Sequence, residues 1–335
     1  MKRILLASCI IACIIMACDS RRRSDKPFLI PSSSGNPYEV MVVVDDSIWN
    51  GPAGKALRKA LNAPVPMLPQ DEPMFHVTRI TPSHYDRITN MFRNIVVFNL
   101  SDDYRDAKFK YEKDVHSYQQ AILSINAPDT QAAADYITNN AGTLQRFFTK
   151  EEIDRQIKKI QYNFNTKFND SVKKYFNCEI MVPPDIMKMK VGKDFIWGSN
   201  DGLETIQNIC VYSYPLDSTE GDEKQKFINI RNEFMAKNIP GYNPGSVMET
   251  TEDIVKISYL KINGRNVMEA RGLWDMSKDA MGGPFVSHTF VDSENNRAVV
   301  VEAFVYAPSK MKRSMIRRLE ASLYTVKLPS DIKNK

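Results

Sequence analysis

The sequence has few of the side chains and motifs that mark a catalytic or metal centre. Only four histidines occur in 335 residues, and none lies close to another at the spacing of metal ligands. The chain also lacks Gly-x-Ser-x-Gly and His-Glu-x-x-His, and no cysteine lies beside a histidine. These absences predict no metal site and no cofactor. They disfavour an enzyme without excluding one, because catalytic groups distant in sequence assemble in space.

The chain also has little excess charge. Its 45 Lys and Arg residues against 40 Asp and Glu residues give a net charge of +5, which is too balanced to predict nucleic-acid binding. The apolar run Ile4–Met16 has 13 residues, whereas a membrane-spanning helix needs about 20. Apolar residues make up 43% of the chain, which is ordinary for a globular protein, and the length predicts about two domains.

The N-terminus has the pattern of a secretory signal that ends at a lipidated cysteine. Lys2 and Arg3 give a positive start, the apolar run follows, and Ile15-Met16-Ala17-Cys18 comes next. This order resembles the lipobox of bacterial lipoproteins, which implies cleavage before Cys18 and its acylation. We therefore predict a signal peptide over residues 1–17 and an effectively permanent lipid anchor in a bacterial membrane. Ordinary secretion, with no role for Cys18, is the alternative.

Residues 18–37 have the composition of a flexible tether. They are charged at first and then rich in Ser, Pro and Gly, so they cannot bury enough apolar surface to order themselves. Some gut-bacterial lipoproteins displayed on the cell exterior carry acidic residues just after the lipidated cysteine. Here Arg21-Arg22-Arg23 follow instead, which by analogy favours a cell-envelope protein that faces the periplasm.

Two cysteines remain in the mature chain, Cys178 and Cys210. Each lies in an apolar segment with the character of a strand. Cysteines on neighbouring strands could form a disulfide in an oxidising compartment, or both could be buried thiols that pack as small apolar groups. The sequence leaves these alternatives open, because it does not supply the Cβ geometry.

The first globular unit, predicted over residues 38–176, is of the α/β type. Apolar runs at 38–44, 75–80 and 94–100 are typical of buried strands, and helices are expected between them, including one over 82–92. Two long helices follow, joined near Thr149, where Thr149-Lys150-Glu151-Glu152 resembles a capping signal.

The second unit, predicted over residues 177–328, is an antiparallel sheet packed by helices, and 329–335 is a tail. Asn263-Gly264 predicts a hairpin between two strands, and a second hairpin is expected around residues 293–296. A final helix runs from Pro308 to about Tyr324. We expect its basic residues to form a solvent-exposed face; these are Lys310, Lys312, Arg313, Arg317 and Arg318. The whole chain is thus predicted to be α+β.

Two resemblances follow from these segments. The second unit, with its ending EAFVYAPSKMKRSMIRRLEASL, resembles PsbP-like and Mog-like sheet-plus-helix domains, which are mostly binding or assembly modules. Segments such as PYEVMVVVDDSIWNGPAGKALRKAL and GLWDMSKDAMGGPFV resemble an uncharacterised lipoprotein family of Bacteroidetes-type bacteria. That resemblance implies a location but no activity.

Asp45 and Asp46 follow the first predicted strand directly. Ligands of α/β sheets bind beyond the carboxyl ends of the strands, so these carboxylates are candidate binding residues. The alternative is a turn in which their oxygens accept backbone hydrogen bonds.

The segment from Arg271 to Pro284 is expected to be a loop with one tryptophan, two methionines and three glycines. Tryptophan and methionine suit a binding surface. We therefore name Arg271, Trp274 and Asp275 as candidate binding residues, together with Trp197, which could lie at the same end of the sheet. Both tryptophans could instead belong to the core.

These patterns favour a binding or assembly lipoprotein of the cell envelope. Its expected partners are the membrane, through Cys18, and an envelope protein or a small ligand. The alternative is an envelope hydrolase that uses carboxylates such as Asp45 and Asp46. That alternative requires a carboxylate inside a cleft.

Overall fold

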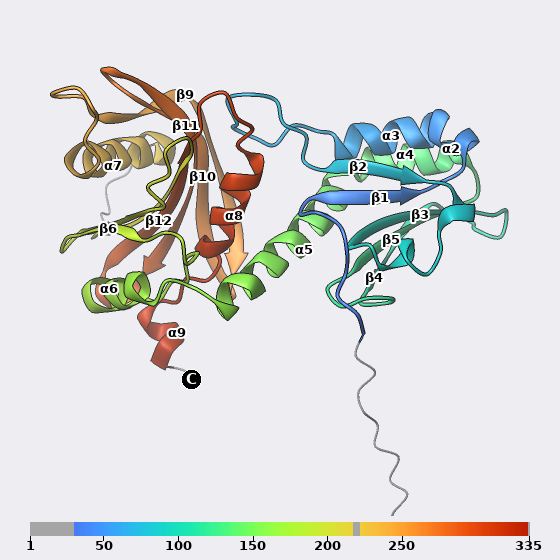
Figure 1. Ribbon diagram of the computed structural model, residues 1–335, viewed down its shortest axis with the longest axis horizontal. Helices are drawn as coiled ribbons and strands as arrows, with labels where there is room; N and C mark the ends of the chain where they lie inside the picture. The colour runs from blue at the N-terminus through green and yellow to red at the C-terminus, as the bar shows by residue number, and fades with distance from the viewer. Residues whose placement is uncertain (1–29, 217–221, 334–335) are drawn as a thin grey trace, which may run out of the picture.

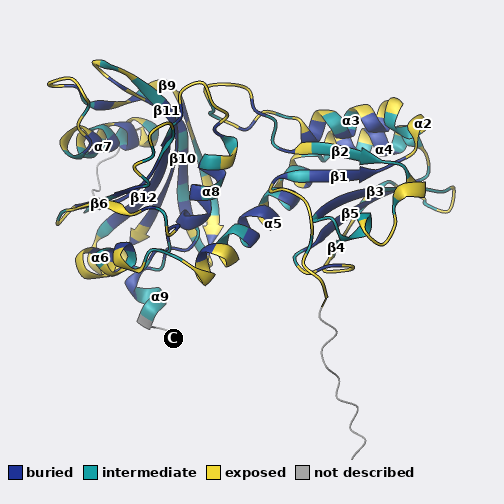
Figure 2. Ribbon diagram, in the orientation of Figure 1, coloured by how far each residue is buried: buried dark blue, intermediate teal, exposed yellow. Residues whose placement is uncertain are grey.

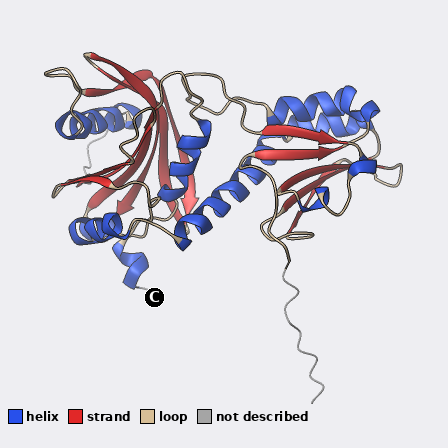
Figure 3. Cartoon of the chain, in the orientation of Figure 1, coloured by secondary structure: helices blue, strands red, loops and turns tan. Residues whose placement is uncertain are grey.

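The computed structural model describes residues 30–216 and 222–333, which form two sheets with helices packed on them (Figure 1, Figure 3). The predicted α+β class is confirmed. The predicted signal peptide, Cys18 and the first part of the predicted tether lie outside the described residues. Among those that are described, no helix is both long and apolar enough to cross a membrane.

The first unit contains a five-stranded sheet in the order β2-β1-β3-β5-β4. Neighbouring strands are parallel except that β4 runs antiparallel to β5. The strands are β1 (Glu39–Val43), β2 (His76–Ile80), β3 (Asn94–Leu100), β4 (Lys108–Lys113) and β5 (Ala121–Ala127). Buried strands β1 and β5 have nearly continuous apolar sequences because both faces of this sheet are covered.

Helices cover one face of this sheet and a loop covers much of the other. The main core lies under α3 (Pro52–Leu61), α4 (Thr130–Asn139) and the first half of α5 (Ala141–Tyr162), and the short α2 (Asp46–Asn50) precedes α3. The prediction of a helix over residues 82–92 is wrong. This segment forms two short 3₁₀ turns, because the Asp86 carboxylate accepts the backbone N–H groups of residues 88 and 89.

The long helices divide at other places than the sequence predicted. Thr149 lies inside α5, so the expected join there is wrong. The break occurs instead at Asn140, whose side chain donates to the Tyr136 carbonyl at 2.9 Å at the end of α4. A second break precedes α6 (Thr166–Phe176), where Asn165 caps the helix by accepting from the Phe168 N–H.

The end of the predicted tether is bound to the sheet. Ser33 donates its backbone N–H to the Tyr118 carbonyl at 3.1 Å, and Ser34 donates to Met91 at 3.0 Å. The predicted flexibility is therefore wrong for residues 31–37, since their backbone groups find partners beside β3 and β5.

The second unit is built on a seven-stranded antiparallel sheet in the order β6-β7-β8-β12-β11-β10-β9. Both predicted hairpins are present, with Asn263 and Gly264 at φ +50° and +79° in the first of them. The strands are β6 (Lys188–Val191), β7 (Phe195–Ser199), β8 (Ile206–Pro215), β9 (Met248–Ile262), β10 (Arg265–Met276), β11 (Asp279–Asp292) and β12 (Arg297–Tyr306).

The segment expected as a loop from Arg271 to Pro284 is a third hairpin. Strand β10 continues to Met276, and β11 begins at Asp279. Gly282 allows β10 to approach closely, because a Cβ there would lie 2.8 Å from the Trp274 carbonyl oxygen. Gly283 likewise allows the approach of β12, because a Cβ there would lie 2.0 Å from the Val305 carbonyl oxygen.

Helices pack on both faces of this sheet, with α8 (Arg313–Leu323) and α6 on one face and α7 (Glu223–Asn238) on the other. Figure 2 shows the buried residues gathered along the sheet between these helices. Because Phe168, Val172 and Phe176 of α6 belong to this core, the units divide between α5 and α6, earlier than the predicted boundary at 176. The predicted tail contains a short helix, α9 (Pro329–Lys333).

Helix α5 connects the two units. It starts against the first sheet and continues along α8 of the second unit (Figure 1). A second connection is the proline-rich loop between α3 and β2, in which Glu72 is only 2% exposed. The Glu72 carboxylate accepts the backbone N–H groups of Lys312 and Arg313 at the start of α8. The first unit therefore caps a helix of the second.

Candidate functional site

The carboxylates at the end of β1 lie on the surface. Asp45, Asp46 and the following Ser47 are all exposed, and Asp46 forms an ion pair with Arg79. Asp45 precedes α2 without capping it through its side chain. The two carboxylates therefore lie in neither of the predicted settings: no backbone N–H is found to donate to their oxygens in this described segment, and they do not lie in the cleft that the hydrolase hypothesis required.

The disulfide alternative is wrong, because Cys178 and Cys210 are both free and buried thiols. They lie on opposite faces of the second sheet: Cys178 packs in the core under α6 and α8, and Cys210 packs in the core under α7. Burial raises the pKa of the Cys178 thiol to about 12 and that of Cys210 well above its usual range.

The four candidate binding residues of the second unit do not lie at a single site. Arg271 points to the α8 face, where it forms ion pairs with Glu320 and with Glu269, the latter at 2.8 Å. Asp275 is exposed at the end of β10. The structure therefore does not join Arg271 and Asp275 to one site.

Trp197 and Trp274, in contrast, line one cavity of about 440 Å³ on the α7 face of the sheet. We call it the tryptophan pocket. Its wall also includes residues from β8, β9, β11 and β12, among them Asn208, Met248, Met281 and Phe304. Trp274 is 2% exposed and belongs to the core as well. The two tryptophans, 77 positions apart in the sequence, thus lie at the same end of the sheet, and their role in binding stays a prediction.

A larger cavity lies between the two units, and the sequence did not point to it. This interdomain cleft has a volume of about 650 Å³. It is bounded by residues 36–39, by the first residue of β2, by Arg93 immediately before β3, and by facing turns of α5 and α8. The cleft is therefore at the amino ends of the parallel strands, whereas the predicted site was at their carboxyl ends.

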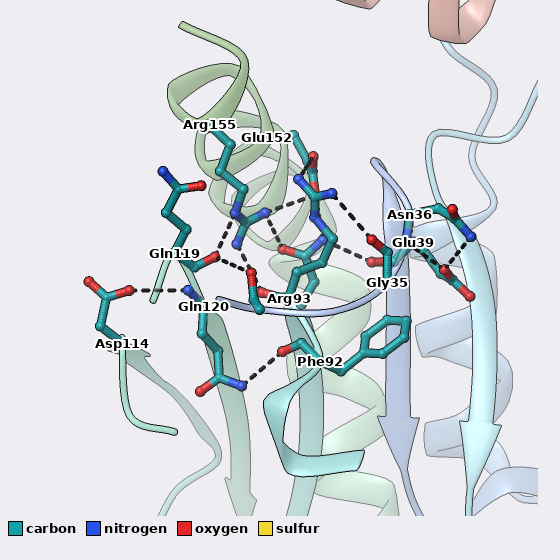
Figure 4. Close-up of polar contacts among 12 residues, drawn as sticks. Gly35, Asn36, Glu39, Phe92, Arg93, Asp114, Gln119, Gln120, Glu152 and Arg155 are labelled. Atoms are coloured by element: carbon teal, nitrogen blue, oxygen red, sulfur yellow. Dashed lines mark hydrogen bonds and ion pairs between the residues drawn. The ribbon is translucent and has the colours of Figure 1, made fainter. Parts of the chain in front are cut away.

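One wall of the cleft is a network of buried charges (Figure 4). The Glu152 carboxylate of α5 accepts from Arg93 at 2.9 Å, from Arg155 at 2.8 Å and from the Asn94 amide at 2.7 Å. Arg155 also donates to the backbone carbonyls of Gln119 and Arg93, at 2.7 and 2.9 Å. This network holds α5 against β3 and fixes the Arg93 guanidinium beside the cleft.

The opposite wall is α8. Arg313 and Arg317 lie one turn apart on this helix, and Arg317 is only 5% exposed. The Arg317 guanidinium lies 5.8 Å from the ring centroid of Tyr38, which comes from the first unit. Burial lowers the pKa of Arg313, and the Arg317 cation lowers it further, although Glu72 opposes both effects. Two cations thus lie close together on this wall, and Arg317 also forms an ion pair with the buried Glu320 at 3.0 Å.

The cleft has many donors and few free acceptors. Its lining contains six Lys or Arg residues and two Glu residues. Of the two carboxylates, Glu152 is bonded as above, and Glu39 accepts from Asn36 at 2.9 Å and from Thr78 at 2.8 Å. In contrast, the buried Nε–H donors of Arg93, Arg313 and Arg317 have no acceptor within the part of the chain that the structure describes.

The prediction that the basic residues of the final helix form a solvent-exposed face is therefore partly wrong. Lys312 and Arg317 are buried, at 4% and 5% exposure, because α8 lies between its own sheet and α5. The signal available in the sequence was the density of Lys and Arg in 310–318, which exceeds what a solvent face needs. Nothing in the sequence showed that α5 and residues 36–39 would face it.

Two consecutive segments match known domains. Residues 33–161 match a domain of unknown function (DUF8532), and residues 165–325 match another domain of unknown function (DUF4837). None of the curated proteins compared with the chain matches it. The short gap between the matched segments falls between α5 and α6, where the packing also divides the chain. The chain thus matches two domains of unknown function in succession, and the interdomain cleft lies between the two matched segments.

Proposed function

We propose that this protein is a lipid-anchored binding module of the bacterial cell envelope that takes an anionic ligand, one with phosphate or carboxylate groups, in the interdomain cleft. The observation that carries the proposal is the set of three buried Nε–H donors, on Arg93, Arg313 and Arg317, that lack an acceptor among the described residues. A buried donor without a partner costs about 1–3 kcal/mol. Ligand oxygens that accept these hydrogen bonds would remove that cost.

The charges around the cleft select an anion over a cation. Its six basic side chains outnumber its two carboxylates, and both carboxylates already accept hydrogen bonds from the protein. Guanidinium groups match the geometry of carboxylate and phosphate oxygens. The volume of about 650 Å³ is within the usual range of small-molecule sites, about 300–1,000 Å³, so the ligand is larger than a single small ion.

The predicted anchor keeps this cleft close to a membrane. Residues 36–39 line it, and the described chain begins at Ile30, twelve residues after Cys18. Twelve extended residues span at most about 40 Å. The same oxygen chemistry could therefore come from a soluble anion of the periplasm or from the headgroup of an anionic lipid.

The anchor itself is tested by labelling. Cells that express the protein with Cys18→Ser should incorporate no radiolabelled fatty acid into it, whereas the wild-type chain should be labelled. Labelling that survives the substitution would contradict the lipoprotein proposal.

Ligand binding is tested by isothermal titration of the full mature chain in mild detergent with citrate and with inorganic phosphate. Choline serves as the cation control. Vesicles of phosphatidylglycerol, compared with vesicles of phosphatidylcholine, separate a lipid source from a soluble one. We expect the anions to bind in a salt-dependent manner and choline not to bind.

Two neighbouring lysines of α5 provide a matched pair of variants. Lys159 lines the interdomain cleft, whereas Lys158 lies over the Tyr118 ring, outside it. Removal of one cation near the ligand costs about 1 kcal/mol, so Lys159→Ala should weaken anion binding about fivefold. Lys158→Ala should leave it nearly unchanged. Equal effects of both substitutions, or no binding of any anion by the wild-type chain, would refute the proposal.

A further inference from the structure

The tryptophan pocket is separate from the interdomain cleft and has the opposite character. It lies on the α7 face of the second sheet, whereas the cleft faces α8. Its walls are mainly aromatic rings and thioethers. Trp274 meets the Phe304 ring edge to face, with centroids 5.7 Å apart at 79°. Met248 and Met281 add flexible apolar surface that adapts to the shape of a ligand.

Among the buried side-chain donors and acceptors of the described residues that line this pocket, one lacks a partner. The Trp197 Nε1–H donates to the Asn208 side chain at 3.0 Å, and at the rim the Lys188 amine pairs with Asp201 at 2.8 Å. The Trp274 Nε1–H is buried and has no acceptor anywhere in residues 30–216 and 222–333. The described part of the pocket therefore has a single buried side-chain donor without a partner, within a mainly apolar wall.

The residue opposite Trp274 in the sheet is a glycine. Gly283 pairs with Trp274 across β10 and β11. A Cβ at Gly283 would lie 3.4 Å from the Trp274 Nε1 atom and 2.0 Å from the Val305 carbonyl oxygen, so the indole and the backbone of β12 both pack closely on this glycine. Trp274 thus belongs both to the core and to the wall of the cavity, and its buried N–H has no partner among the described residues.

We propose that the tryptophan pocket binds a small uncharged ligand with an apolar ring or branched alkyl group and one carbonyl or ether oxygen, which accepts the Trp274 Nε1–H. The ligand is uncharged because burial of an unpaired ion in such a wall would be very costly. It carries one oxygen because the pocket has one unpaired donor. The volume of about 440 Å³ accommodates one ring with short substituents.

The test compares two ligands of the same shape, acetophenone and α-methylstyrene, which differ only by a carbonyl oxygen in place of a CH₂ group. The full mature chain with ¹⁵N-labelled tryptophan has three indole N–H signals, from Trp49, Trp197 and Trp274. Each ligand is titrated in mild detergent, and micelles alone are titrated in parallel to correct for partition. The signal of Trp274 is assigned from Trp274→Phe.

We expect acetophenone to move the Trp274 indole proton downfield in a saturable manner and to bind about fivefold more tightly than α-methylstyrene, as one buried hydrogen bond implies. Trp274→Phe keeps a ring in the core and should remove this preference, so that the two ligands bind equally. The control Trp49→Phe, in the first unit beside Arg58, should change neither affinity.

Three results would overturn the proposal. They are equal affinity of the wild-type chain for both ligands, no saturable shift with either, and a shift of the Trp197 signal while that of Trp274 stays fixed. Should Trp274→Phe fail to fold, the comparison of the two ligands on the wild-type chain still decides. Citrate should compete with neither ligand, which keeps this outcome independent of the anion proposal.

Discussion

The contact between Glu72 and α8 should contribute measurably to the free energy of unfolding. Glu72 comes from the loop between α3 and β2. Its carboxylate accepts the first free backbone N–H groups of α8, which are those of Lys312 and, at 2.8 Å, of Arg313. Loss of a helix N-cap costs about 0.5–2 kcal/mol. Each hydrogen bond to a charged group contributes about 1.5–3 kcal/mol. We therefore expect Glu72→Ala to destabilise the protein by about 2–4 kcal/mol.

The assay is urea denaturation of the full mature chain, followed by tryptophan fluorescence. Asp71→Ala is the matched control, because Asp71 is the exposed neighbour of Glu72 and such surface substitutions stay within about 0.5 kcal/mol. Glu72→Gln keeps one acceptor oxygen and should have an intermediate effect. If Glu72→Ala were no more destabilising than Asp71→Ala, the reasoning that this carboxylate fastens the two units would be wrong.

Three further predictions concern the second unit. Arg231→Met leaves the fully buried Glu302 carboxylate without its ion-pair partner and should cost about 3–5 kcal/mol in urea denaturation. Burial raises the pKa of Cys178 to about 12, so a thiol reagent at pH 8 should label the thiols only after unfolding. Burial alone would raise the pKa of Glu269, but the Arg271 guanidinium lowers it below its usual value. The free energy of unfolding should therefore fall as pH drops below about 4.3, the pKa of a Glu carboxyl in the unfolded chain. An acid titration that shows no such loss of stability would contradict the Glu269–Arg271 ion pair.

The repetitive parts of the fold could be predicted from the sequence, because they depend on local pattern. Continuous apolar runs identified β1 and β3, and Asn263-Gly264 identified the β9–β10 hairpin. Local pattern failed where a single side chain redirected the backbone. Asp86 replaces a helix by turns, and Asn140 ends α4 before the position that a capping motif at Thr149 suggested.

The interdomain cleft could not be predicted, because no single segment carries it. Its arginines come from the residue before β3, from α5 and from α8, and the sequence separates Arg93 from Arg317 by 224 positions. The basic run of the last helix was visible, but burial of Arg317 depends on α5 packing beside α8. The tryptophan pocket was partly visible, since tryptophan, methionine and glycine between strands pointed to Trp274.

The measurement that tests the central claim most directly is a crystal structure of the protein soaked in selenate, an anion whose selenium is located by anomalous scattering. We expect a peak in the interdomain cleft, with selenate oxygens about 2.7–3.2 Å from the Nε atoms of Arg313 and Arg317. Peaks confined to exposed lysines elsewhere, with the cleft unoccupied at saturating selenate, would contradict it.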